Sequence, residues 1–321
     1  MNIFYPVKIF SEWVCFRLLG LDSSSSIGEV VSYFFYDSIK IAILLLVIIT
    51  FISFVRSYLP PEKIKKILTQ RFQLAGHVLA AFLGIVTPFC SCSAVPLFIG
   101  LVESGVPLGV TFSYLVSAPM VNEVAAVLLL GLFGWKVALI YIISGVVIAV
   151  VTGFIIGRLR LENLLEKYVN QGKNFSSQSN SPQKIKVRLS EAWQYSWGLF
   201  LKIFPYVLVG IGFGATIHGY APENILATLA GKRNFLAVPV AVIVGVPLYS
   251  NAAGIVPVVV SLIEKGLPLG TALAFMMAVT ALSLPEMIIL RKVLKFKLLA
   301  IYVTVLTLGI IFTGYLFNWI I

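Results

Sequence analysis

The sequence predicts an all-α polytopic membrane protein built from two inverted repeats, each with three spanning helices and one re-entrant helical hairpin. Three observations favour this fold class. Of the 321 residues, 59% are hydrophobic and 12% are charged, whereas an ordinary soluble domain is about 25% charged. The second half of the chain repeats the first. Each half also contains one long apolar segment whose centre is rich in proline and polar residues.

Long runs without charged residues divide the chain into eight apolar segments. Several of them reach the roughly 20 residues that an α-helix needs to cross a bilayer. We therefore expect a multi-pass protein of the cytoplasmic membrane, with the lipid bilayer as its main surroundings. The segments cover residues 38–55, 74–102, 107–132, 137–157, 195–217, 235–263, 268–290 and 298–321.

These segments, with the polar stretches between them, predict four regions. Lys8, Glu12 and Arg17 interrupt the apolar residues near the N-terminus, which argues against a signal peptide and favours an amphipathic helix on the membrane surface. A Ser-, Asn- and Gln-rich stretch after the fourth segment is typical of a flexible linker. The expected regions are an N-terminal interfacial helix and loop (1–37), a first transmembrane repeat (38–157), a cytoplasmic linker (158–194) and a second transmembrane repeat (195–321).

The two halves align without a gap when the sequence is shifted by 161 residues. Chance could match Leu with Val among apolar segments, but not Pro, Gly and Glu at one fixed offset. The matched residues include a short turn in which we expect Gly105 and Gly266 to end one helix and a proline to begin the next. The sequence therefore predicts an internal duplication. Pro61, Gly84, Pro96, Glu103 and Pro107 fall on Pro222, Gly245, Pro257, Glu264 and Pro268.

The distribution of Lys and Arg favours one of two topologies. If the second segment of each half enters and leaves on one side, each half has three spans and the repeats are inverted. Loops 56–73, 158–192 and 291–297 then share a face with 16 basic residues, against 4 on the other face, omitting Lys202 and the N-terminal region. Eight full spans in parallel repeats give 12 against 8. Because basic residues gather on the cytoplasmic side, we favour inverted repeats and keep parallel repeats as the alternative.

The second apolar segment, residues 74–102, is too long and too interrupted for one spanning helix. As a single helix it would extend about 43 Å, whereas the hydrocarbon core is about 30 Å thick. Pro88 and Pro96 each remove a backbone donor, so we expect breaks there. Pro247 and Pro257 are the expected breaks of the second half. Interrupted segments at matching positions of two halves indicate the substrate site of a transporter.

The first interrupted segment carries two thiols, Cys90 and Cys92, flanked by Ser91 and Ser93. In extended backbone, side chains two positions apart point the same way, so the two sulfurs can converge on one metal or metalloid centre. Paired thiolates suit a soft centre; the alternative is that each cysteine packs as a small hydrophobic residue. The second half has Asn251 at the position of Cys90, so the thiol pair is confined to one repeat.

Polar residues of the third, sixth and seventh segments are further candidates for the substrate site. Glu123 and Glu286 lie in apolar surroundings, where a carboxylate is costly unless it faces a cavity or a partner. We expect proton coupling from one or both; the alternative is that they bind freed backbone groups and only hold the fold. Asn122, Tyr249 and Asn251 are expected to contact substrate, hairpin backbone or both.

Composition and missing motifs argue against several other functions. The net charge of +11 comes from loops between apolar segments, so nucleic acid is not an expected partner. Three cysteines do not make a disulfide framework. The sequence has no Walker A loop, no HExxH zinc motif and no GxSxG serine-hydrolase motif. We therefore expect neither enzymatic activity nor a cofactor.

Three strings resemble the ArsP/YraQ-type predicted permease family of bacteria and archaea. They read TPFCSCS from Thr87, GVPLG from Gly105 and SAPMVNE from Ser117, and the first is the most specific. The resemblance runs from about residue 38 to the end of the chain. Members with an assigned role export trivalent organoarsenicals. The resemblance implies that Cys90 and Cys92 bind a trivalent arsenical through sulfur.

Taken together, the residues and the resemblance predict a secondary-active permease that exports a small thiophilic solute, such as a trivalent organoarsenical. One alternative is a permease for another small, sulfur-containing solute. Another is a membrane thiol–disulfide redox protein that cycles Cys90 and Cys92. Two dead-end hairpins disfavour a passive channel. The sequence leaves open the substrate, the direction of transport, the coupling ion and whether the protein is a homo-oligomer.

Overall fold

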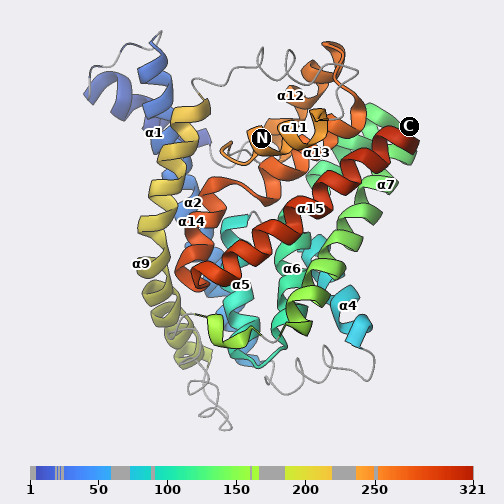
Figure 1. The fold of residues 1–321 in the computed structure, drawn as a ribbon. Helices are drawn as coiled ribbons and strands as arrows, with labels where there is room; N and C mark the ends of the chain where they lie inside the picture. Colours follow the sequence, from blue (N-terminus) through green and yellow to red (C-terminus); the bar gives the residue numbers. More distant parts are fainter. Residues whose placement is uncertain are drawn as a thin grey trace.

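The computed structural model describes most of the chain, and almost every described residue is helical (Figure 1). Some side chains within the described helices, including those of Cys92 and Lys202, are not described. The chain is therefore an all-α membrane protein. The described residues are 5–18, 20, 22, 25–58, 73–87, 91–159, 161–165, 185–218, 236–248 and 252–320.

The helices form two successive series, which we call the first half (α2 to α7) and the second half (α9 to α15). A short N-terminal pair, α1 (Tyr5–Glu12) and the π-helix η1 (Trp13–Leu18), precedes them. The first half contains α2 (Ser26–Tyr58), α4 (Gln73–Val86), α5 (Ser91–Glu103), α6 (Leu108–Met120) and α7 (Glu123–Arg158). After the 3-10 turn η2 (Glu162–Leu164), the second half contains α9 (Ile185–His218), α11 (Ala237–Gly245), α12 (Ala252–Glu264), α13 (Leu269–Ala281), α14 (Leu284–Val293) and α15 (Phe296–Ile320).

Three of the described helices are long and apolar enough to cross a bilayer: α2 over Val30–Phe51, α7 and α15. A fourth span is formed if α13 and α14, which meet at a 45° bend, are counted together. Helices α4, α5, α6 and α12 are apolar but shorter than a span. Large apolar side chains on the spanning helices are exposed, among them Val47, Val147 and Leu308, as lipid contact requires.

The helix bounds repeat with the offset of 161 residues found in the sequence. Helices α5 and α6, shifted by this offset, begin and end on the bounds of α12 and α13. The turns between them also match, because Gly105 and Gly266 have φ of 78° and 94°, a left-handed conformation that favours glycine. The predicted glycine-ended turns are therefore confirmed, and Pro107 and Pro268 are the N-caps of the next helices.

Helix α7 is two helical pieces joined at Gly134, whose φ of 82° is not helical. The first piece covers 123–133 and the second 135–158. In the second half the corresponding pieces are separate: α14 ends at Val293 and α15 begins at Phe296. From α6 in the first half and from α13 in the second, the order is therefore the same: a short helix, a break, a second short helix and a long helix.

Contacts in the first half fix the directions of its helices. Gly84 of α4 packs on Ser117 of α6, and His77 lies 2.9 Å from Ser113 between ring nitrogen and hydroxyl oxygen, so α4 and α6 run the same way. Helix α5 runs back along α6, with Phe98 against Phe112 at 5.2 Å between ring centroids. The chain therefore reverses direction between α4 and α5.

The long second piece of α7 runs opposite to α6. Gly109 near the start of α6 contacts Gly157 near the end of α7, and Val121 just after α6 contacts Gly145. The end of α6 therefore lies level with the middle of that piece. The second half repeats these contacts: Gly245 packs on Ala278, and Gly314 packs on Val238, Ala274 and Gly270.

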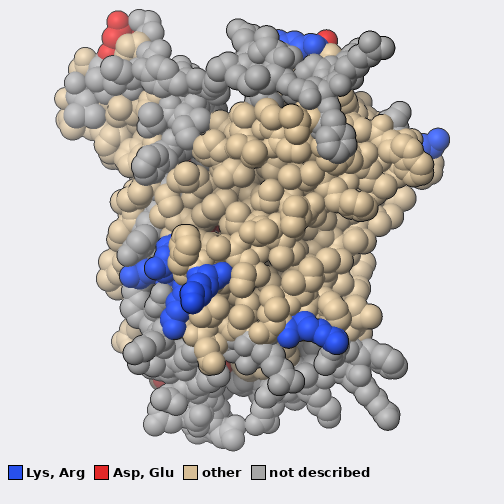
Figure 2. All heavy atoms as spheres, viewed as in Figure 1, with Lys and Arg blue, Asp and Glu red and all other residues tan. Residues whose placement is uncertain are grey.

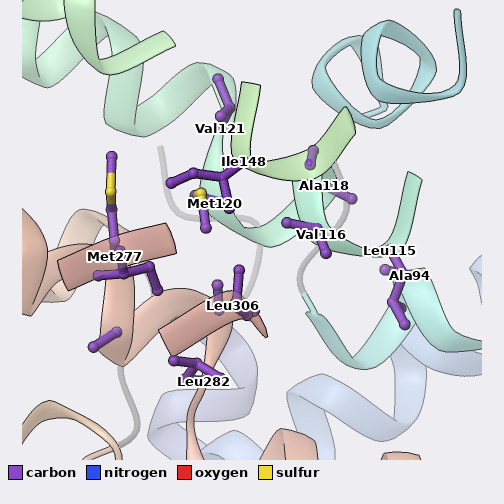
Figure 3. Close-up of a cluster of buried hydrophobic side chains, with 14 of the residues drawn as sticks. Ala94, Leu115, Val116, Ala118, Met120, Val121, Ile148, Met277, Leu282 and Leu306 are labelled. Carbon is purple, nitrogen blue, oxygen red and sulfur yellow. The ribbon is translucent and has the colours of Figure 1, made fainter. Parts of the chain in front are cut away.

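The two halves meet along α7 and α15, which cross in Figure 1. Ile148 packs on Gly309, its own counterpart in the repeat. Met120 and Ile148 lie in one buried cluster with Met277, Leu282 and Leu306 (Figure 3). At one end, residues just after α7 bind residues just before α15: Leu165 bridges Leu294, and the Lys295 amide donates to the Leu164 carbonyl at 2.9 Å. The end of α7 and the start of α15 therefore lie together.

Helices α2 and α9 pack on each other along one side of the molecule (Figure 1), and they cover α5 and α14 respectively. At the end of α5, Glu103 accepts a hydrogen bond from the Tyr195 hydroxyl of α9 at 3.1 Å. This contact joins the end of α5 to α9.

Several sequence expectations need correction. Pro96 and Pro257 lie inside α5 and α12, so the predicted breaks at these residues are wrong. Each proline is five residues after the first residue of its helix, and the helix continues through it although proline cannot donate an intrahelical bond. Pro247 does lie in the turn after α11, and Pro88 is outside the described residues.

Three apolar segments have other bounds than expected. Helix α2 starts at Ser26, twelve residues before the predicted first segment. The third and seventh segments, expected as single helices, are each interrupted, at 121–122 and at 282–283. Both breaks lie at the same position of the repeat, with Asn122 as the N-cap residue of α7 and Ser283 as that of α14.

Candidate functional site

The break between α6 and α7 is closed by two hydrogen bonds. The Asn122 side chain caps α7 by accepting from the Ala125 amide at 2.7 Å, and the Tyr141 hydroxyl donates to the Met120 carbonyl at 2.8 Å. Both bonds satisfy backbone groups that a helix end leaves free. Asn122, a predicted substrate contact, therefore has a structural role in this break.

The break between α13 and α14 is built differently. Ser283 occupies the N-cap position without a side-chain capping bond. The Leu284 amide donates instead to the Val246 carbonyl at 2.8 Å, in the turn after α11. The hairpin turn and the helix break of the second half are thus joined through backbone.

The two predicted carboxylates lie in different environments. Glu123 is exposed on the first turn of α7, next to the exposed residues Val124 and Val127. Glu286 is 2% exposed on the first turn of α14. The partial positive charge of a helix N-terminus favours either carboxylate, but only Glu286 is removed from the surface.

The helix that carries Glu286 packs on α15, which carries a buried tyrosine. Tyr302 of α15 is 1% exposed and interacts electrostatically with Glu286. The Tyr302 ring packs on Phe112 of α6, at 5.5 Å between centroids. Glu286 therefore lies close to the contact between the two halves.

The helices that carry the predicted site residues pack across the two halves. Helix α5, which starts at Ser91 and contains Cys92, packs on α14, which carries Glu286. Helix α12, which starts just after Asn251, packs on α7, which carries Glu123. The fold thus brings the cysteine-bearing helix next to the helix of the buried carboxylate.

The sulfur site itself is only partly described. Cys90, Tyr249 and Asn251 lie outside the described residues. The backbone of residues 91–93 forms the first turn of α5, but their side chains are not described. Among the described residues, no group of three or more His, Cys, Asp and Glu side chains could hold a metal ion.

Helix α2 carries polar residues that the sequence analysis missed. Asp37 and Ser38 are each 7% exposed, and the Tyr33 hydroxyl is hydrogen-bonded to Asp37. They lie within the span that begins at Val30, about 10 Å along the helix from its start. Ionisable residues inside a span are functional candidates. Asp37 is a charged residue directly before the expected first segment, residues 38–55. Because charged residues usually end an apolar run, the sequence did not indicate that the span begins before it.

Comparison with known proteins identifies the family of this chain. Residues 26–319 match the family model ArsP_1, described as a predicted permease. The chain belongs to this family. The family match confirms the resemblance seen in the sequence and makes the chain a membrane transport protein.

Relatives in archaea and bacteria extend the family match. The UPF0718 protein MJ0584 of Methanocaldococcus jannaschii is 21% identical over 274 residues, covering 68% of this chain and 75% of the relative. The UPF0718 protein YraQ of Escherichia coli is 25% identical over 255 residues, covering 77% and 68%. A Streptococcus mutans protein, named as a subunit of a two-component membrane permease complex, is 21% identical over 179 residues, covering 55% and 58%. No solved structure matches the chain.

Proposed function

We propose that this permease is a secondary-active exporter of a small thiophilic solute, such as a trivalent organoarsenical. The observation that carries the proposal is the packing of α5, with its Cys-x-Cys start, on α14, with its buried Glu286. A soft ligand pair and a buried carboxylate are then contributed by helices of different halves. The direction of export and the substrate class rest on the family resemblance.

We propose inverted repeats as the scaffold, each with three spans and one re-entrant hairpin. The reversal of direction between α4 and α5 supports a hairpin, because both arms lie along α6. The proximity of the end of α7 to the start of α15 supports inversion, since these are equivalent helices running opposite ways. Parallel repeats would put those two ends on opposite faces.

We propose that the face at the end of α7 is cytoplasmic. The chain between Val293 and Leu298 carries Lys295 and Lys297 and follows Arg291 and Lys292 at the end of α14. The two largest groups of blue Lys and Arg atoms lie around and below the middle of the view, and smaller groups lie at its top and upper right (Figure 2). The basic residues between α14 and α15 follow the tendency of Lys and Arg to stay on the cytoplasmic side.

The proposed chemistry uses the two sulfurs for binding and a carboxylate for coupling. A trivalent methylarsenical carries two hydroxyl groups, and their exchange for the sulfurs of Cys90 and Cys92 forms two As–S bonds and releases two water molecules. The reverse exchange with water frees the solute. Glu286, and not the exposed Glu123, is the proposed proton-binding group, because a neutral carboxyl is far less costly than a charged one inside the membrane.

The test is uptake of a trivalent methylarsenical into everted membrane vesicles, with and without a proton gradient. We expect uptake by the wild type and none by the Cys90→Ser/Cys92→Ser variant. Cys15→Ser is the matched control: Cys15 is fully buried in η1, burial raises the pKa of its thiol, and the variant should transport normally. Wild-type uptake by the double variant would refute the sulfur site. If only sulfur-containing solutes are moved, the alternative permease is favoured.

A further inference from the structure

Two buried tyrosines occupy the same position of the two repeats. Tyr141 of α7 and Tyr302 of α15 are separated by the repeat offset, and they are 0% and 1% exposed. Tyr141 donates its hydroxyl hydrogen to the Met120 carbonyl, at the end of α6. The equivalent carbonyl for Tyr302 is that of Ala281, at the end of α13.

The Tyr302 hydroxyl does not repeat this bond. It is buried and has no hydrogen-bond partner within the described part of the chain, which is a costly state for a polar group. Glu286 is buried on the first turn of α14, which packs on α15, and it interacts electrostatically with Tyr302. In the first half, the position of Glu286 is held by Ala125, also buried. The second repeat therefore has a carboxyl beside a tyrosine where the first has a methyl group.

A phenol and a carboxyl in this arrangement have two ways to be satisfied. An ionised carboxylate only accepts hydrogen bonds, and the phenol can donate to it. When the carboxyl is protonated it no longer needs that donor, and the phenol can donate to the carbonyl at the end of α13, the counterpart of the Met120 carbonyl that Tyr141 binds. The hydroxyl can thus change partner with the charge of Glu286.

We propose that Tyr302 is the positioning residue for Glu286, donating to its ionised carboxylate and turning to the Ala281 carbonyl when the carboxyl is protonated. This inference rests on the proposed role of Glu286 as the proton-binding group. The inference assigns Tyr302 as the hydrogen-bond partner of Glu286, and it explains why Tyr302 does not repeat the bond that Tyr141 makes.

Other titratable groups on the elements packed against α14 lie elsewhere or are not described. Glu103 of α5 and Tyr195 of α9 bind each other at the end of α5. On α14 itself, Arg291 donates to the Leu294 carbonyl at 3.2 Å, at the far end of the helix. Lys292 lies beside Arg291 at that far end of α14. Lys186 and Glu191 near the start of α9 are exposed, and Lys297 and Tyr315 lie near the two ends of α15. The remaining groups on α5 and α9, whose side chains are not described, are Cys92, Arg188, Lys202, Tyr206 and His218.

The test is labelling of Glu286 by dicyclohexylcarbodiimide, which reacts with protonated carboxyls in apolar surroundings. The purified full-length protein in detergent is labelled over a range of pH, and the modified peptide is quantified by mass spectrometry. Without the Tyr302 donor the charged form is less stabilised, so labelling of Tyr302→Phe should persist to higher pH, by about one unit or tenfold in proton concentration. Glu286→Gln identifies the labelled site.

Matched variants separate this role from a packing effect. Tyr141→Phe should lower the unfolding temperature and leave the labelling curve unchanged, whereas Tyr302→Gln, which keeps a donor, should restore the wild-type curve. An unshifted curve in Tyr302→Phe, or an equal shift in Tyr141→Phe, overturns the proposal. If Glu286 is not labelled at any pH, its proton-binding role fails as well. These readouts need no transported solute, so an error about the cargo would not affect them.

Discussion

The two halves share their helices but not their chemistry. Helices α5 and α6 have the bounds of α12 and α13 at the repeat offset, yet the Cys-x-Cys pair lies in the first half and the buried carboxyl in the second. Where the first half has Ala125, the second has Glu286. The scaffold therefore tolerates polar and apolar residues at equivalent positions, so a polar residue present in one half only is a candidate for function.

The same comparison distinguishes structural polar groups. His77 and Ser113 are hydrogen-bonded between α4 and α6, and their counterparts are Val238 and Ala274, which pack around Gly314. His77 is 6% exposed, so this polar pair is buried between the two helices. An apolar pair serves the same contact in the second half, which suggests that the polar pair is replaceable as a unit.

The largest expected effect separates the two carboxylates. Glu286→Gln should reduce proton-driven uptake into everted vesicles to the background level, because the amide cannot release a proton. Glu123→Gln should retain most of the uptake, since Glu123 is exposed and lies on α7, which packs on α12. Both variants need matched amounts in the membrane, measured by immunoblot. A greater loss in Glu123→Gln would reverse the proposed assignment.

A second prediction concerns close packing. A side chain at Gly153 would overlap the Ser113 side chain and the Gly109 carbonyl, whereas one at Gly131 meets nothing within 4 Å. Gly153→Leu should lower the free energy of unfolding by about 3 kcal/mol, and Gly131→Leu should leave it nearly unchanged. Thermal unfolding in detergent measures both. Equal stability of the two variants would contradict the packing of α6 on α7.

A third prediction replaces the hydrogen-bonded pair of the first half with the apolar residues found at the same positions of the second half. His77→Val alone leaves the Ser113 hydroxyl without its side-chain partner and should cost about 2 kcal/mol of stability. Adding Ser113→Ala reproduces the pair of the second half and should recover much of that loss. A double-mutant cycle in thermal unfolding gives the coupling. Strictly additive losses would mean that the two halves do not pack alike here.

The smallest expected effect compares the two N-caps. Asn122→Ala removes a capping bond of 2.7 Å to the Ala125 amide and should cost about 1 kcal/mol. Ser283→Ala removes no side-chain capping bond and should cost less than half as much. Thermal unfolding midpoints of the purified variants measure the two losses. A larger loss in Ser283→Ala than in Asn122→Ala would mean that the Ser283 side chain stabilises the break of the second half.

Features set by local residues could be predicted from the sequence. The helical class follows from long apolar runs, and the duplication from matched Pro, Gly and Glu. Gly105 and Gly266 were expected at helix ends, and their positive φ agrees. These features need only a few neighbouring residues, which a sequence displays directly.

Features set by tertiary neighbours could not be predicted. Glu123 and Glu286 look alike in the sequence, but the packing of α9 on α14 is one difference between their surroundings. Pro96 was expected to break α5, and the helix nevertheless continues through it. Asp37 was placed before the first segment because a charge usually ends an apolar run, yet it is buried within α2.

The backbone pairing of Leu165 with Leu294 also constrains how the halves can move. Together with the bond from the Lys295 amide to the Leu164 carbonyl, it fastens the end of α7 to the start of α15. If the halves rock against each other during transport, this fastening acts as the pivot, and the widest displacement occurs at the opposite ends of those two helices. An access path on that far face would then open further than one beside the paired backbone of Leu165 and Leu294.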